Sequence, residues 1–194
     1  MFKKILVALD SSPLRGVVFN QALQLAQQTG ASLSLLHVLS AYEEGSPGIP
    51  IHSYQAYYPV LDDALWKDYQ ERWEKFEADR LARLRREVDQ AMALGVPTEF
   101  SQVVGDPAIT ICATAQTCQA DLIVIGSHGR RGLQEMILGS VSNYVMHRAP
   151  CSVLVIRGEQ IPALLPLPRK GLPNNPSRLP LGPRIERPST RTIS

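Results

Sequence analysis

The chain has 194 residues, of which 44% are hydrophobic, so it is long enough for one domain with a substantial core and an appended segment. Its net charge is +2, but the segment after residue 157 holds six Lys/Arg against two Asp/Glu, which leaves the preceding body at about −2. A slightly acidic body argues against a nucleic-acid-binding domain, and no apolar run reaches the length of a transmembrane helix.

The first predicted element is an apolar strand over residues 4–9, which ends at Asp10. Because Asp10 interrupts the apolar run so early, a signal peptide is not expected. A helix follows, with Ser12 as its N-cap, Pro13 as its first residue and Gly30 at its end. We expect its buried face to carry Val17, Ala22, Leu25 and Ala26.

The second predicted strand covers residues 32–39 and contains His37. A single histidine in an apolar strand is more often a packed, hydrogen-bonded residue than a catalytic one, and we interpret His37 in that way. Residues 39–60 then form a long loop with glycines, prolines and tyrosines. A loop of this length fits either a lid over a ligand or an uncovered insertion.

A long helical pattern covers residues 61–94, because apolar residues recur at three- and four-residue steps until Gly95. It predicts a crossover helix packed on the sheet, whose first turns extend beyond the sheet because the helix is longer than a crossover needs. We interpret the charged run 80–86 as solvated surface. The residues expected on the apolar face are Leu65, Tyr69, Trp73, Phe76, Leu84, Val88 and Met92.

The alternation over residues 97–104 predicts a half-exposed strand. A helix follows it, with Asp106 as its N-cap and Pro107 as its first residue. The residues of this helix that suit burial are Ile109, Ala113 and Ala115.

The stretch 121–157 has the features of a phosphate site. A short buried strand over 122–125 ends in a glycine turn, a helix begins at Ser140 directly after Gly139, and a last strand covers 152–156. Glycines let backbone N–H groups approach phosphate oxygens, and a helix N-terminus adds unpaired donors and the positive end of its dipole. Taken alone, glycines after a strand are equally explained by the conformational needs of a tight turn.

Five predicted strands alternate with helices over residues 1–157, which indicates parallel βαβ units with right-handed crossovers. The pattern fits an α/β fold, a three-layer α/β/α doubly wound sheet of five parallel strands in the order 3-2-1-4-5. In this order the switch point, where open sheets bind ligands, lies between the first and fourth strands. Asp10 and Gly126 are therefore expected on opposite sides of one crevice.

The three cysteines show no metal-ligand spacing and, being three, cannot all form disulfide bonds within the chain. We predict reduced, mostly buried thiols in a cytoplasmic protein rather than a redox centre. They are Cys112, Cys118 and Cys151.

Residues 158–194 differ in composition from the rest, since eight of these 37 residues are proline and the leucines follow no helical or strand period. We predict an extended, disordered tail. Its two Pro-x-x-Pro patterns, at 173–176 and 180–183, are of the kind that docks into an aromatic groove of a partner, although such short patterns arise easily in proline-rich sequence.

The full pattern Gly-x2-Gly-x9-Gly-Ser is more specific than its parts. With Gly126, Gly129, Gly139 and Ser140 at all four places, it resembles the nucleotide-binding signature of the universal stress protein family. The resemblance covers about residues 1–157 and implies an ATP-binding member with an adenine nucleotide α-hydrolase-like fold. The tail lies outside it.

This resemblance implies roles for residues on both sides of the crevice. Asp10 would contact the nucleoside, and the backbone at Val38 would hold the adenine base. The phosphates of ATP, with or without Mg²⁺, would be bound by a bent loop and a helix start formed by Gly126, Gly129, Gly139 and Ser140. The positions of four more residues suggest further contacts with the nucleotide: Ser127, His128, Arg130 and Ser142. Loop arginines such as Arg130 are, however, often solvated, and Ser142 could equally be an exposed helix residue.

The sequence thus predicts a cytoplasmic, ATP-binding universal stress protein that signals through a homodimer joined at the last strand, Ser152 to Ile156. Binding is favoured over turnover because the chain lacks Gly-Lys-Ser/Thr and shows no general base paired with a nucleophile. One alternative is a slow ATPase or adenylate-transferring enzyme. Another is a scaffold that binds a protein partner through its tail. No nucleic-acid or membrane partner is expected.

Overall fold

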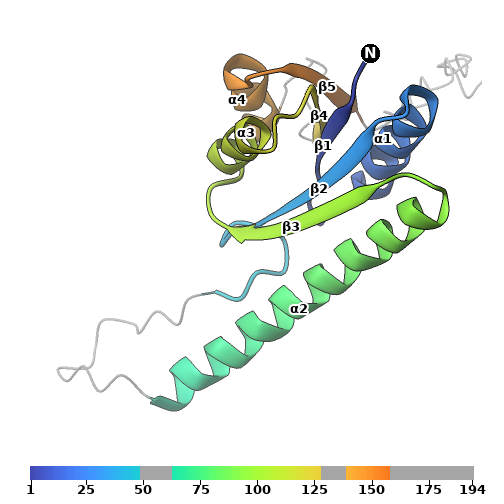
Figure 1. The fold of residues 1–194 in the computed structure, drawn as a ribbon. Coiled ribbons are helices and arrows are strands. Elements are labelled where there is room, and N and C mark those ends of the chain that lie inside the picture. The colour runs from blue at the N-terminus through green and yellow to red at the C-terminus, as the bar shows by residue number, and fades with distance from the viewer. Residues whose placement is uncertain (49–62, 128–138, 158–194) are drawn as a thin grey trace, which may run out of the picture. The chain divides into compact units, whose positions relative to one another are not determined.

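The computed structural model describes residues 1–48, 63–127 and 139–157 (Figure 1). They form a parallel sheet in the order β3-β2-β1-β4-β5, with helices on both faces, which confirms the predicted fold class. The elements are β1 (Lys4–Ala8), α1 (Arg15–Thr29), β2 (Ser32–Leu39), α2 (Asp63–Ala93), β3 (Thr98–Val104), α3 (Pro107–Thr117), β4 (Leu122–Ser127), α4 (Ser140–Arg148) and β5 (Ser152–Arg157). The predicted tail and most of the predicted 39–60 loop lie outside the described residues.

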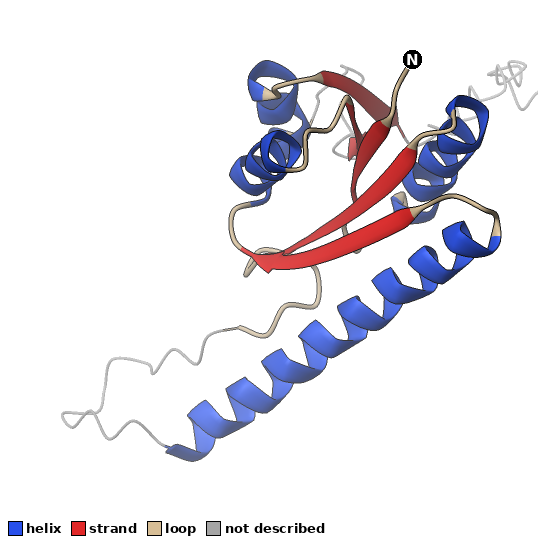
Figure 2. Cartoon of the chain, viewed as in Figure 1, coloured by secondary structure: helices blue, strands red, loops and turns tan. Residues whose placement is uncertain are grey.

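The two faces of the sheet are covered by different helix pairs (Figure 2). Successive strand residues point to opposite faces, so each strand contributes to two cores. Ile5 and Val7 of β1 pack in one cluster with residues of α1 and α2. Leu6, between them, packs in the other cluster with residues of α3 and α4. Apolar residues on both sides of β1 and β4 explain why these two strands contain continuous apolar runs.

Helix α1 begins at Arg15, two residues later than predicted. Ser12 and its neighbours form a turn instead, in which the Arg15 amide donates to the Ser12 carbonyl at 3.1 Å. The predicted end is confirmed, because Gly30 adopts a left-handed conformation with φ of 72°. The burial predicted for Val17 is wrong, since Val17 is 46% exposed and Val18 occupies the buried face.

Helix α2 extends past the sheet at its N-terminal end, as predicted (Figure 1). Its later turns are buried against the sheet, for example at Leu84 and Val88. Its first turns are not, and Leu65 is 41% exposed. The burial predicted for Leu65 and for Met92 is therefore wrong, and Ala91 is buried where Met92 was expected.

Aromatic side chains form a chain of contacts along the projecting half of α2. Ring centroids lie 5.8 Å apart for Trp66 and Tyr69, 6.4 Å for Tyr69 and Trp73, and 5.7 Å for Trp73 and Phe76. The guanidinium of Arg80 lies 4.3 Å from the Phe76 ring centroid and continues the chain towards the sheet. Contacts at three- and four-residue steps hold these rings on one side of the helix.

The turn into α3 matches the sequence pattern. Asp106 is the N-cap, its carboxylate accepts from the Ile109 amide at 3.0 Å, and Pro107 is the first helical residue. The burial predicted for Ile109 and Ala113 is wrong, because both are exposed and Ile111 faces the core with Ala115. The half-exposed character predicted for β3 is confirmed, since β3 is an edge strand of the sheet.

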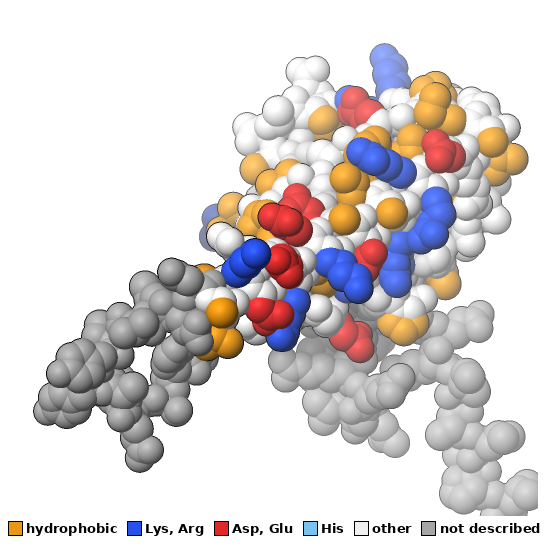
Figure 3. Space-filling view, turned by 90° about the horizontal axis from the view of Figure 1, so that it is seen from below, with side chains coloured by type: hydrophobic (Ala, Val, Ile, Leu, Met, Phe, Trp, Pro, Cys, Tyr) orange, Lys and Arg blue, Asp and Glu red, His pale blue; other side chains and the backbone are white. Residues whose placement is uncertain are grey.

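The surface seen from below Figure 1 carries acidic and basic side chains interspersed with apolar ones (Figure 3). Among the described residues on this face, charges of both signs therefore lie close to one another. Within the described ranges, no helix is long and apolar enough to span a membrane.

Candidate functional site

Three predicted site residues follow strand positions that are in register at the carboxyl edge of the sheet. Ala8 of β1 is in register with Leu36 of β2 and with Ile125 of β4. Two residues beyond these three positions lie Asp10, Val38 and Ser127, and we refer to these three residues as a row. Since neighbouring strands lie about 4.8 Å apart, the row spans roughly 10 Å from Val38 to Ser127. The row crosses the switch point between β1 and β4, where open α/β sheets bind ligands.

Asp10 begins the turn that joins β1 to α1. Its carboxylate accepts from the amide of Ser12 at 3.1 Å and from the Ser12 hydroxyl at 2.6 Å. Its carbonyl accepts from Arg15 at 2.9 Å. Asp10 therefore organises the turn, and its side chain is exposed at the carboxyl edge of the sheet. A nucleoside contact of Asp10 stays a prediction.

Gly126 lies inside β4, in register with Ile156 of β5, and not in a bend. A Cβ at this position would come within 3.2 Å of side-chain atoms of both Leu14 and Val18. The absence of a side chain at Gly126 thus permits the close approach of Leu14 and Val18 to β4. The prediction that Gly126 bends the loop is wrong. Its packing role could not be read from the local pattern, because α1 and β4 are far apart along the chain.

The start of α4 lies against the end of β4. The Gly139 amide donates to the Ser127 hydroxyl at 3.4 Å, and the Ser142 hydroxyl donates to the Gly139 carbonyl at 3.0 Å. Ser142 is only 2% exposed, so its interpretation as an exposed helix residue is wrong. Ser140 is exposed as the first residue of α4. The predicted contacts of three further residues lie outside the described residues; these are His128, Gly129 and Arg130.

Among the residues that the structure describes, no side chain caps the N-terminus of α4. Gly139 provides no side chain to cap it, and the first turn holds no acidic residue. Its unpaired amides and its dipole therefore favour a negative group beside Ser140. Val38, on the other side of β1, is buried in the core shared with α3 and α4. The described residues of the glycine pattern, Gly126, Gly139 and Ser140, thus lie at the same edge of the sheet as the Asp10 turn.

Two buried charged contacts near this edge were missed in the sequence. Arg15 forms a bidentate pair with Glu87 of α2, with distances of 2.7 and 2.8 Å. Glu43 lies between His37 of β2 and Arg80 of α2. His37 is fully buried and hydrogen-bonded, which confirms its interpretation. The interpretation of the 80–86 run as solvated surface is wrong for Arg80, whose side chain is 12% exposed.

The three cysteines are free and half-buried: Cys112, Cys118 and Cys151. Burial raises the pKa of the thiols of Cys112 and Cys151, so both stay protonated and weakly nucleophilic near neutral pH. In the part of the chain that the structure describes, no three His, Cys, Asp or Glu side chains cluster in a way that could hold a metal ion.

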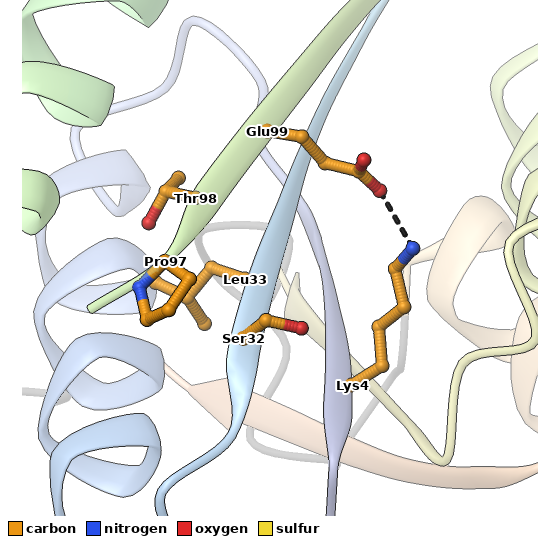
Figure 4. Close-up of a pocket in the computed structure, with 6 residues that line it drawn as sticks. All are labelled: Lys4, Ser32, Leu33, Pro97, Thr98 and Glu99. Carbon is orange, nitrogen blue, oxygen red and sulfur yellow. Dashed lines mark ion pairs between the residues drawn. The ribbon is translucent and has the colours of Figure 1, made fainter.

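A hollow of about 270 Å³ lies between the amino ends of β1, β2 and β3 (Figure 4). Lys4 and Glu99 form an ion pair across it at 2.8 Å. The hydrogen bond between them raises the pKa of Lys4 and lowers that of Glu99. This hollow is at the opposite edge of the sheet from Asp10, and its charged groups already neutralise each other, so it is not part of the candidate site.

A family model, related sequences and solved structures that match this chain name the same family. The model of the Universal stress protein family matches residues 1–157. Universal stress protein Sll1388 of Synechocystis sp. is 33% identical over 156 residues, which cover 80% of this chain and 98% of that protein. The structure of UspA from Lactobacillus plantarum has a TM-score of 0.59 and 28% identity, covering 80% of this chain and 97% of that one. A universal stress protein family protein of Arabidopsis thaliana with AMP bound shares the fold, with a TM-score of 0.51 and 22% identity over 81% of this chain and 93% of that one.

Proposed function

Because the chain belongs to the universal stress protein family, we propose that it binds an adenine nucleotide, ATP in the first instance, and acts as a nucleotide-dependent stress-response module. The observation that carries the proposal is the register of Ala8 with Leu36 and with Ile125, two residues beyond which Asp10, Val38 and Ser127 follow at the switch point. Asp10 and Val38 would bind the nucleoside. Gly126, Ser127 and the start of α4 would bind the phosphates.

The charges of the site support the assignment of the nucleoside to Asp10 and Val38 and of the phosphates to the start of α4. The N-terminus of α4 begins at the exposed Ser140 and suits phosphate oxygens, and the Asp10 carboxylate suits hydroxyl or amino donors of a nucleoside. The first turn of α4 has no acidic side chain, so Mg²⁺ would be held mainly by the phosphates and water, with hydroxyl groups in support. The crystallised Arabidopsis relative with AMP bound is an example of this fold holding an adenine nucleotide.

Calorimetric titration of the full chain with ATP, ADP, AMP and GTP, with and without Mg²⁺, tests the proposal. Adenine nucleotides are expected to bind and GTP to bind more weakly. Asp10→Asn is expected to weaken adenosine, AMP and ATP alike by about tenfold, roughly the contribution of one charge-assisted hydrogen bond. Ser140→Ala is expected to weaken ATP more than adenosine, because Ser140 lies on the phosphate side.

Asp89→Asn is the matched control, since it removes the same charge from the exposed surface of α2. It should leave every affinity unchanged. The absence of adenine-nucleotide binding under all conditions would refute the proposal. Multiple-turnover release of phosphate that depends on Asp10 would instead favour a slow ATPase.

We also propose that two copies pair through β5. This strand ends the sheet, and Leu154 near its middle is 38% exposed. An edge strand presents unpaired N–H and C=O groups, and a two-fold pair of edges satisfies both at once. Residues 1–157 would then form the dimerising domain, and the proline-rich residues 158–194 a separate tail available to a protein partner.

Leu154→Lys is expected to weaken this dimer at least tenfold, because each lysine would lie close to its mate across the two-fold axis. Light scattering over a concentration series measures the change. Val103→Lys on the opposite edge strand is the matched control, since Val103 is 39% exposed. A dimer that survives Leu154→Lys but dissociates with Val103→Lys would place the interface on β3 instead.

A further inference from the structure

Glu43 is buried in a segment whose neighbours are exposed. It follows β2, and its side chain is 8% exposed, whereas Tyr42 and Glu44 are exposed. One carboxylate oxygen, Oε1, accepts hydrogen bonds from the Ser11 hydroxyl, from Nε2 of His37 at 3.0 Å and from Nε of Arg80 at 3.3 Å. Glu43 thus joins three elements that are separate in the sequence.

The carboxylate of Glu43 is held in its charged form. Burial by itself disfavours the charge, but the hydrogen bonds from His37 and Ser11 and the charge of Arg80 outweigh it, and the pKa of Glu43 lies below its ordinary value. Its hydrogen bond to Ser11 is therefore charge-assisted and stronger than a neutral one. Arg80 is fixed in turn by the Phe76 ring and by the Glu44 carbonyl, to which it donates at 3.0 Å.

The turn that carries Asp10 is consequently anchored to α2 at two points. Ser11 is bound through Glu43 to Arg80. The Asp10 carbonyl is bound through Arg15 to Glu87. Arg80 and Glu87 are seven residues, or about two turns, apart and so lie on the same side of α2. The Asp10 carboxylate accepts from the amide and the hydroxyl of Ser12.

We propose that Glu43 is a positioning residue for the nucleoside half of the site, which it serves by holding the Asp10 turn through Ser11. The inference rests on the proposed function and extends it to a residue that does not touch the nucleotide. Ordering the turn before the nucleotide arrives removes an entropic cost from binding. When Glu43 no longer holds Ser11, binding has to order the turn, and the affinity falls.

Glu43→Gln keeps the size of the side chain and removes its charge. Calorimetric titration is expected to give a five- to tenfold loss of affinity, about the contribution of one hydrogen bond. The factor should be the same for adenosine, AMP and ATP, because Asp10 serves the nucleoside. Ser11→Ala should give the same loss, and Glu44→Gln, an exposed neighbour, should give none.

The decisive measurement repeats Glu43→Gln in an Asp10→Asn background. A residue that acts through Asp10 has less than a twofold effect there, whereas a residue that only supports the fold weakens binding by the same factor in both backgrounds. The second result would overturn the proposal. If Glu43→Gln does not fold, Ser11→Ala in the same two backgrounds decides the question by the same criterion.

The two proposals fail in different ways. A parent chain that binds adenine nucleotides, with Glu43→Gln and Ser11→Ala variants that bind equally well, would overturn the role of Glu43 and leave the proposed function standing. A parent chain that binds no adenine nucleotide would overturn both.

Discussion

Replacing Arg15 by methionine is expected to lower the free energy of unfolding by about 3 kcal/mol, because it leaves the carboxylate of Glu87 without its partner in a largely buried place. The side chains of Arg15 and Glu87 are 8% and 16% exposed. The loss corresponds to a fall in the unfolding midpoint of roughly 6–12 °C for a domain of this size. Urea denaturation followed by circular dichroism measures it.

Two further variants separate the buried charge from the loss of contacts. In the double variant Arg15→Met with Glu87→Leu, most of the stability should return, since no unpaired charge remains. Arg72→Met removes an arginine from an exposed pair with Asp68 on α2 and should cost less than about 0.5 kcal/mol. Equal losses for Arg15→Met and Arg72→Met would contradict the expectation.

Gly126→Val is expected to destabilise the protein by about 2 kcal/mol, because the new side chain would occupy space that Leu14 and Val18 already fill. Gly126→Ala should cost about half as much, since only the Cβ enters and the tips of both side chains can yield. Thermal unfolding of both variants measures the series.

Gly16→Ala is the matched control for this series. A Cβ at Gly16 would meet no atom within 4 Å, and alanine favours a helix more than glycine does. Its unfolding midpoint should stay the same or rise. A Gly126→Val variant as stable as the parent would show that α1 can move away from β4, and the packing role of Gly126 would then be wrong.

The fold could be predicted because its signals are local. Apolar runs mark the inner strands, and their alternation with helices implies a parallel sheet. Asp106 and Pro107 start α3, and Gly30 ends α1, through contacts with residues a few positions away. The positions of Asp10 and Gly126 at the carboxyl edge follow from where the apolar runs end, whereas the role predicted for Val38 came from the family resemblance alone.

The buried ion pair, the burial of Glu43 and the buried faces of the helices depend on contacts between distant parts of the chain, which no local sequence pattern indicates. Arg15 and Glu87 are 72 residues apart, and a charged residue on a helix is ordinarily solvated. Glu43 lies in a polar loop that gave no sign of burial. Exposed Val17 and Ile109 show the same limit for apolar residues, because the side of a helix that is buried depends on how the helix crosses the sheet.

The contacting aromatic side chains on α2 also provide an intrinsic fluorescence probe. The chain has two tryptophans, and both, Trp66 and Trp73, are on the projecting half of α2. Fluorescence excited selectively at tryptophan therefore originates from this helix, whereas circular dichroism reports on the backbone of the whole chain. Trp73 contacts Phe76, on which Arg80 is stacked, and Arg80 donates to Glu43. The tryptophan emission of an unlabelled sample is therefore sensitive to the position of the Arg80 side chain.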